Sequence, residues 1–157
     1  MSLTRSELQE LHDDRCRQVA LRRRPGGRDA VAEWLTEPGV VPRRWPPAMA
    51  VAWVVVFITA AALEPSAADP EAPAPLWASL LFMGLLVALT ATSVGLSRRQ
   101  RGGLVASAAA AGLGLVAAVM CPVSAHHAQV GAWWYLQMAG FVALVGASLV
   151  GLRRARA

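Results

Sequence analysis

Four long apolar stretches dominate the hydrophobic pattern of this chain, at residues 46–63, 76–96, 104–120 and 132–152. None contains a charged residue, and each is close to the roughly 20 residues that a helix needs to cross about 30 Å of hydrocarbon. Polar or proline-containing connections separate them. The pattern predicts an all-α fold: a four-helix transmembrane bundle, preceded by a polar segment at residues 1–45 and followed by an arginine-rich tail at 153–157.

Small residues inside the apolar stretches indicate how these helices pack. They recur about every fourth position in the fourth stretch and the second, and they fill most of the third: Ala139, Ala143, Ala147 and Gly151; Gly84, Ala88 and Thr92; Ser107, Ala111, Gly112 and Gly114. Small side chains let helix backbones approach closely, which is the main packing device in lipid. We expect the third stretch to be the central helix of the bundle.

The polar segment contains two short amphipathic patterns. A capping box at residues 4–7 begins a helix that ends before Pro25, and a second helix is expected at residues 28–35. Their apolar faces carry Leu8, Leu11 and Val19 in the first helix and Val31, Trp34 and Leu35 in the second. Two short helices cannot bury a sizeable core between them. Their apolar faces therefore need a partner, which is another protein, the lipid surface or the bundle's own loops.

Charge fixes the expected orientation. All fifteen basic residues are arginines, and they lie in residues 1–45, 97–101 and 153–156, whereas the connections at 64–75 and 121–131 have none. Basic residues near span ends stay on the cytoplasmic side, so both termini are expected in the cytoplasm, with the chain in a bacterial inner or plasma membrane. The absence of lysine and asparagine suggests a GC-rich bacterial genome. The arginines are not interpreted as a nucleic-acid surface, because topology explains them.

The apolar stretches also argue against several functions. They contain no Asp, Glu, Lys, Arg or His, whereas proton relays, ion pathways and haem-bearing bundles place ionisable or ligating groups at membrane depth. No nucleophile, base and orienting acid can be placed on one side of the membrane. We therefore expect neither a transporter nor an electron carrier, and no enzyme.

The connection after the third stretch holds the main cluster of reactive side chains. Cys121, His126 and His127 could supply thiolate and imidazole ligands to zinc or copper, and Met120 or Met138 could add a thioether for Cu(I). Pro122 is expected to end the span and to turn Cys121 toward the histidines. The alternative is an interfacial thiol beside two exposed histidines. Cys16 lies across the membrane from Cys121, so the two cannot form an intramolecular disulfide.

The run Cys121-Pro122-Val123-Ser124-Ala125-His126, followed by Trp134-Tyr135-Leu136 and a small-residue span that ends at Arg153-Arg154, resembles the last loop and helix of NrsF-type multi-pass membrane anti-sigma factors. The resemblance covers about 40 residues. Members of that family usually have six spans. The resemblance implies a short cytoplasmic segment that holds a sigma factor, with Cys121 and His126 as sensor positions for metal or oxidant.

Two functional hypotheses follow. In the first, the chain is a non-enzymatic membrane sensor or regulator, in which metal or oxidant at Cys121, His126 and His127 releases a cytosolic partner from the N-terminal helices. In the second, it is a small accessory or assembly subunit of a larger membrane complex. Its small-residue faces and its tryptophans would then be docking surfaces.

Overall fold

The computed structural model describes residues 27–64, 75–124 and 130–155, and all the regular structure in them is helical. The chain divides into two units, residues 1–34 and 35–157. The first amphipathic helix, with Leu8, Leu11 and Val19, lies outside the described residues.

The second amphipathic helix is confirmed as α2, Gly27–Thr36. No residue of α2 is buried: Val31 is 57% exposed, and Trp34 and Leu35 are half-buried. Gly39, with a φ of 78°, adopts the left-handed conformation that glycine tolerates, in the turn that follows the helix. Among the described residues, Val31 on the apolar face of α2 is thus exposed.

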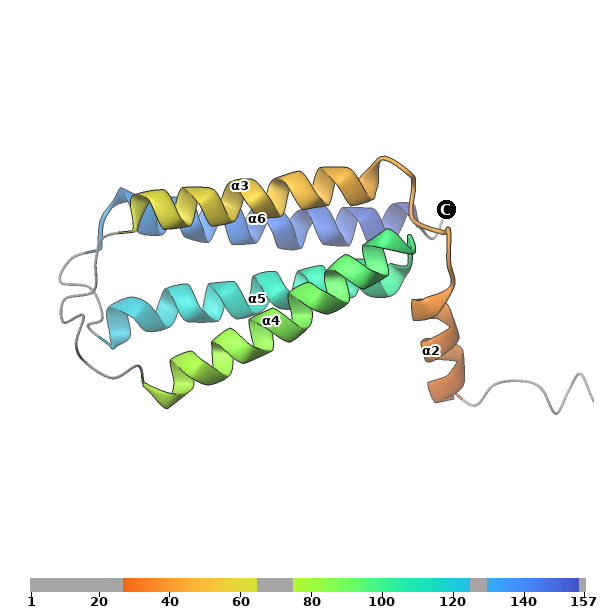
Figure 1. The fold of residues 1–157 in the computed structure, drawn as a ribbon, viewed down its shortest axis with the longest axis horizontal. Coiled ribbons are helices and arrows are strands. Elements are labelled where there is room, and N and C mark those ends of the chain that lie inside the picture. Colours follow the sequence, from red (N-terminus) through yellow and green to blue (C-terminus); the bar gives the residue numbers. More distant parts are fainter. Residues whose placement is uncertain (1–26, 65–74, 125–129, 156–157) are drawn as a thin grey trace, which may run out of the picture. The chain divides into compact units, whose positions relative to one another are not determined.

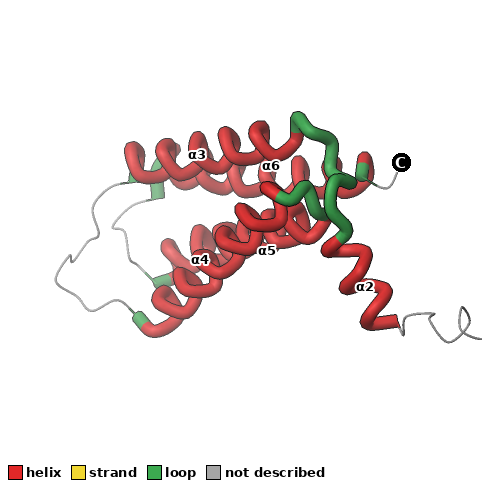
Figure 2. The backbone as a smooth tube through the Cα atoms, turned by 45° about the vertical axis from the view of Figure 1, so that its right-hand side comes forward, coloured by secondary structure: helices red, strands yellow, loops and turns green. Residues whose placement is uncertain are grey.

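The membrane unit consists of four helices, each long and apolar enough to cross a bilayer: α3 (Trp45–Leu63), α4 (Leu76–Ser97), α5 (Arg101–Val123) and α6 (Ala132–Arg154). This confirms the all-α bundle of four spans. The helices pack in the order α4, α5, α6, α3, and no comparable packing joins α3 to α4 (Figures 1 and 2). The ring of four helices is therefore open between α3 and α4.

The central position of the third span is also confirmed. In the most apolar 18-residue stretch of each helix, 33% of the residues are buried in α5 and 11% in α3. The α5 helix packs against both α4 and α6. Its buried residues are mostly small, including Ser107, Ala111 and Gly114. Small residues explain the central position of α5, because they let a neighbouring helix approach closely on each of its two packed faces.

The two ends of this unit are named here by their charges. The arginine-bearing end comprises the start of α3, the end of α4, the start of α5 and the end of α6, with Arg43, Arg44, Arg98, Arg99, Arg101, Arg153 and Arg154. The other end is called the opposite end. At the arginine-bearing end, a Cβ placed on Gly95 would lie 2.5 Å from the Gly103 backbone. The backbones of α4 and α5 are in direct contact there.

One packing prediction is wrong. The stripe Ala139, Ala143, Ala147 and Gly151 is not the buried face of α6, because Ala139 and Ala143 are exposed. The buried face carries Phe141, Leu144, Ser148 and Gly151 instead. The reason is complementary size: the Phe141 ring occupies the space over Gly114, where a Cβ would lie 2.5 Å from it. Large residues of one helix meet small residues of the other, rather than small against small.

Candidate functional site

Residues 35–44, called the linker, lead from α2 into α3 and are hydrogen-bonded to residues 98–100, called the α4–α5 loop. The amides of Gly39 and Val41 donate to the carbonyls of Arg98 and Arg99, at 3.2 and 3.0 Å. The Arg99 guanidinium donates back to Val41 O through Nε, at 2.8 Å, and to Gly39 O at 2.9 Å. The four bonds together are called the junction.

The junction depends on an unusual backbone position. Arg99 has a φ of 56°, at the place after a helix end where glycine is usual. The amide of Arg99 donates to Leu96 O and that of Gln100 to Gly95 O, which is the Schellman pattern of helix termination. An arginine pays a conformational cost there that glycine would not. Its two bonds to linker carbonyls offset that cost.

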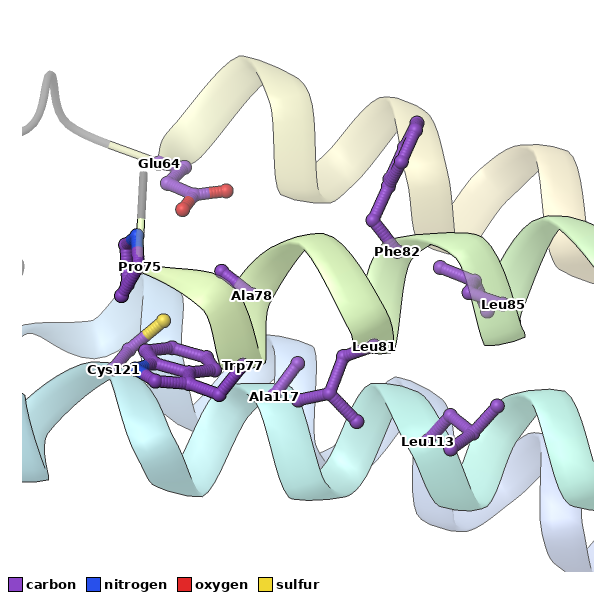
Figure 3. Close-up of a pocket in the computed structure, with 10 residues that line it drawn as sticks. All are labelled: Glu64, Pro75, Trp77, Ala78, Leu81, Phe82, Leu85, Leu113, Ala117 and Cys121. Atoms are coloured by element: carbon purple, nitrogen blue, oxygen red, sulfur yellow. The ribbon is translucent and has the colours of Figure 1, made fainter. Parts of the chain in front are cut away.

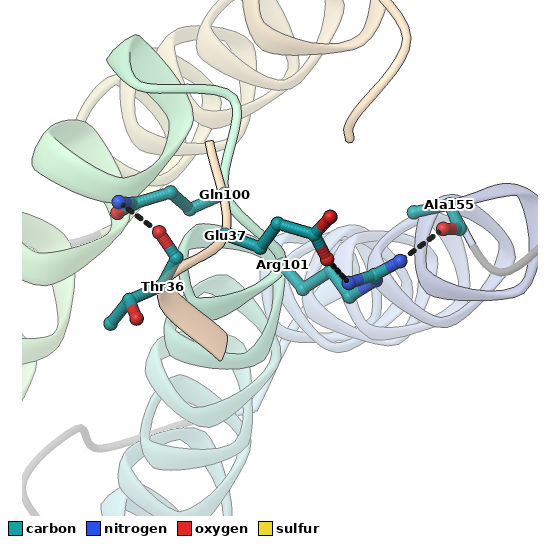
Figure 4. Close-up of polar contacts among 5 residues, drawn as sticks. All are labelled: Thr36, Glu37, Gln100, Arg101 and Ala155. Atoms are coloured by element: carbon teal, nitrogen blue, oxygen red, sulfur yellow. Dashed lines mark hydrogen bonds and ion pairs between the residues drawn. The ribbon is translucent and has the colours of Figure 1, made fainter. Parts of the chain in front are cut away.

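Two further side chains extend this network, as Figure 4 shows. Gln100 Nε2 donates to Thr36 O at 2.6 Å, and Arg101 forms an ion pair with Glu37 at 2.8 Å. The same guanidinium donates to Ala155 O at 2.9 Å, just beyond α6. The Arg101 side chain is only 11% exposed, whereas that of Glu37 is 55% exposed, so the pair lies at the surface with only its arginine shielded from solvent. The start of α5 is thereby tied to the linker and to the end of α6.

A buried polar cluster joins three helices about a third of the way along the bundle. The Trp53 indole donates to Ser107 Oγ at 3.0 Å, the hydroxyls of Ser107 and Ser148 lie 3.1 Å apart, and Ser148 Oγ lies 2.8 Å from Leu144 O. Each hydroxyl has one proton, so all these contacts are satisfied when Ser148 donates to Leu144 O and Ser107 to Ser148. Such bonds hold helices together in an apolar environment.

At the opposite end, an apolar pocket of about 300 Å³ lies among α4, α5 and the end of α3. Cys121 is half-buried in its wall, together with Trp77, Leu81 and Glu64. Figure 3 shows the Cys121 sulfur pointing toward the start of α4, beside the Trp77 ring. Here a thiol and a carboxylate border an otherwise apolar space. Any group added to the sulfur would have this space, bordered by the start of α4, beside it.

The expected end of the third span at Pro122 is wrong, since α5 continues through Pro122 to Val123. A proline without an N–H leaves the carbonyl four residues before it, that of Ala118, without its helical partner. The Trp134 indole donates to this carbonyl at 2.7 Å. Trp134 thus ties α6 to α5. Pro122 therefore does not turn Cys121 out of the helix.

The predicted metal ligands are only partly within the described residues. His126 and His127 lie outside them. Among the residues that the structure describes, no three His, Cys, Asp or Glu side chains come together as a metal site. The zinc or copper site at Cys121, His126 and His127 therefore stays a prediction. Of the predicted partner-binding residues, Val31 is exposed, and Leu35 is half-buried where α2 meets the linker.

Sequence reasoning missed the junction and the polar cluster. The positive φ at Arg99 could not be seen, because an arginine gives no signal of left-handed backbone. Trp53 and Ser107 lie 54 positions apart, and only packing brings them together. Comparison with known proteins finds no matching family model, no matching curated protein and no matching solved structure.

Proposed function

We propose that this protein is a non-enzymatic membrane regulator. It holds a cytosolic partner through its N-terminal helices and changes that hold when metal or oxidant acts at the opposite end of the bundle. The observation that carries the proposal is the junction, which ties the linker to the α4–α5 loop. Because the linker is bonded to this loop, a turn of α4 about its arginine-bearing end would act on the segment that precedes the membrane.

The hairpin of α4 and α5 provides the connection along the bundle. Its loop holds the linker, and its far ends carry Trp77 and Cys121 in the wall of one pocket. A soft cation bound by the Cys121 thiolate, with His126 and His127 as further ligands, or oxidation of the thiol, would change the volume and charge in this pocket. Allostery requires two states of the protein that differ both at the site of the metal or oxidant and at the site of the partner.

The partner is expected at the apolar faces of the N-terminal helices, where Val31 is exposed. The NrsF-type resemblance suggests a sigma factor as its class. The proposal places both termini in the cytoplasm of a bacterium, with Cys121 toward the outside. Fusion of a reporter that works only outside the cytoplasm should give signal after Ala72 and none after Gly102. Signal after Gly102 would reverse the orientation and remove the proposed input side.

The regulator proposal can be tested by capture of the cytosolic partner on the full chain in lipid nanodiscs. Capture should fall when zinc or Cu(I) is added, and Cys121→Ser should abolish that response. Leu8→Asp with Trp34→Asp should abolish capture itself. Unchanged capture in the presence of metal or oxidant would contradict the proposal.

An uncoupling variant separates the input from the output. Arg99→Ala removes the side-chain half of the junction and should leave capture intact while the response to metal is lost. Arg98→Ala is a matched control in the same loop, because no described residue accepts a hydrogen bond or ion pair from its side chain. If both variants respond like the parent protein, the junction does not transmit the signal.

One observation favours the second candidate, an accessory or assembly subunit. The small residues Ala139, Ala143 and Gly146 form an exposed face of α6, and a Cβ on Gly146 would meet nothing within 4 Å. A neighbouring transmembrane helix could approach closely there. Gly146→Val together with Ala143→Val should then abolish co-purification of the other subunit without affecting the fold. Co-purification that survives this change would exclude the face as the docking surface.

A further inference from the structure

A groove of about 470 Å³ separates α3 from α4 at the arginine-bearing end. One wall is formed by α3 from Pro46 to Val54, and the other by α4 from Leu89 to Ser97, with Trp53 among the lining residues. It exists because α3 packs on α6 and α4 packs on α5, while no comparable packing joins α3 to α4. Figure 2 shows α3 beside α6 and α4 beside α5.

The groove has the length of one membrane leaflet. Each wall covers nine residues, which is about 12 Å of helix at 1.5 Å per residue. One leaflet supplies about 15 Å of the 30 Å hydrocarbon thickness. Both walls end level with the arginine-bearing ends of their helices. The groove thus runs from the headgroup level to about the middle of the bilayer.

The walls offer an apolar surface despite three hydroxyl groups. Those of Thr92, Ser93 and Ser97 each donate to a carbonyl of their own helix, at 2.7 to 2.9 Å. Their protons are therefore engaged, and Trp53 donates into the bundle and not into the groove. A hydrocarbon chain can lie on such a surface without leaving a polar group unsatisfied.

Exposed arginines lie within three residues, in the sequence, of the headgroup-level end of each groove wall. Arg44 directly precedes α3 and Arg98 directly follows Ser97, and both are exposed, as is Arg43. Among the described residues, none forms a hydrogen bond or ion pair with these three side chains. The α3 terminus adds no free amide, because Pro46 and Pro47 have none and the amides of Trp45 and Ala48 are already bonded. Any anion at this end of the groove must be bound by guanidinium groups.

We propose that the groove between α3 and α4 binds one anionic phospholipid of the leaflet at the arginine-bearing end. An acyl chain lies along Ala50, Trp53 and Leu89, and the phosphate is bound by Arg44 and Arg98. Basic pockets between transmembrane helices bind anionic headgroups in this way. A transmembrane helix from a partner fits less well, because it would need a surface across both leaflets. The inference is independent of the proposed regulatory function.

Native mass spectrometry of the full chain, titrated in detergent with phosphatidylglycerol or phosphatidylcholine, tests the proposal. One phosphatidylglycerol should bind at least tenfold more tightly than phosphatidylcholine. Arg44→Gln with Arg98→Gln should remove that preference, since each arginine near the surface contributes roughly fivefold. Arg28→Gln with Arg153→Gln removes the same charge from positions that are distant in sequence from both groove walls, and it should leave the preference intact.

A second pair of variants tests the acyl-chain site. Ala50→Phe fills the groove and should abolish tight binding of one lipid, whereas Ala61→Phe, on an exposed position of α3 outside the groove, should not. If the arginine variant fails to fold, this pair of variants still tests whether the lipid binds in the groove. Equal binding of both lipids, equal losses in both arginine variants, or unchanged binding in Ala50→Phe would each overturn the proposal. So would a dimer that only Ala50→Phe dissociates, because the occupant would then be a second copy.

Discussion

The two ends of the helical bundle are built differently. At the arginine-bearing end, α4 and α5 touch through their backbones at Gly95 and Gly103, and the linker is bonded to their loop. Toward the opposite end, a Cβ on Gly84 would meet only the tip of the Leu113 side chain, at 3.4 Å. An apolar pocket lies between the same two helices there. Figure 1 shows α4 inclined to α5, which fits this difference.

The difference indicates where the bundle can move. Backbone contact and hydrogen bonds fix a distance within tenths of an ångström, whereas side chains around a pocket can repack. The arginine-bearing end is therefore a fixed point, and the start of α4 is the part that can shift. A regulator with its input at Cys121 would use this arrangement, because displacement at the loose end turns α4 about the fixed one.

The largest loss of stability is expected where the backbones of α4 and α5 are in contact. Gly95→Ala should lower the free energy of unfolding by about 3 kcal/mol or more, because the new Cβ meets backbone atoms that cannot rotate away. Gly84→Ala should be neutral, or stabilising by up to about 1 kcal/mol from helix propensity. Unfolding of the purified protein by SDS titration gives both values. Equal values would remove the distinction between the ends.

The second largest loss of stability is expected at the polar cluster of Trp53, Ser107 and Ser148. Ser107→Ala leaves the buried Trp53 indole without its acceptor and should cost about 2 kcal/mol in the same titration. Ser148→Ala should cost less, because Ser107 can still accept from Trp53. If Ser148→Ala is the more damaging change, the cluster is held together by Ser148 and not by Ser107.

The junction offers a sharper comparison at a single residue. Arg99→Ala keeps the strained backbone and loses both bonds to the linker, and it should cost roughly 1–2 kcal/mol. Arg99→Gly loses the same bonds but relieves the left-handed conformation, so it should be about 1 kcal/mol more stable than Arg99→Ala. Thermal unfolding of the two variants should show this order, and the reverse order would mean that Arg99 carries no backbone strain.

The smallest effect is expected at the opposite end. Trp134→Phe removes the donor to Ala118 O and should cost about 1 kcal/mol or less. In a Pro122→Ala background, the restored amide of residue 122 can bond Ala118 O, so Trp134→Phe should then cost almost nothing. A double-mutant cycle of thermal unfolding measures this coupling. Additive effects would show that Trp134 does not compensate for Pro122.

The sequence alone determined the number of spans, their approximate bounds and the short helix before them. Four charge-free stretches of span length allow few other folds, because a chain in lipid must satisfy its backbone hydrogen bonds within each helix. It also identified α5 as central, since small residues such as Ser107 and Gly114 permit two packed faces. It selected Cys121 by its chemistry, which depends on residue type and not on position.

Only the tertiary structure decided which faces meet and where the reactive groups lie. The sequence predicts a packing face at Ala139 and Ala143, but both are exposed. Phe141 packs over Gly114 instead. The helix continues past Pro122, and a tryptophan from another helix donates to the carbonyl that the proline leaves without its helical partner. Such outcomes depend on contacts between residues distant in sequence. Periodicity reports which residues share a face of a helix, but the partner of that face is selected by fit.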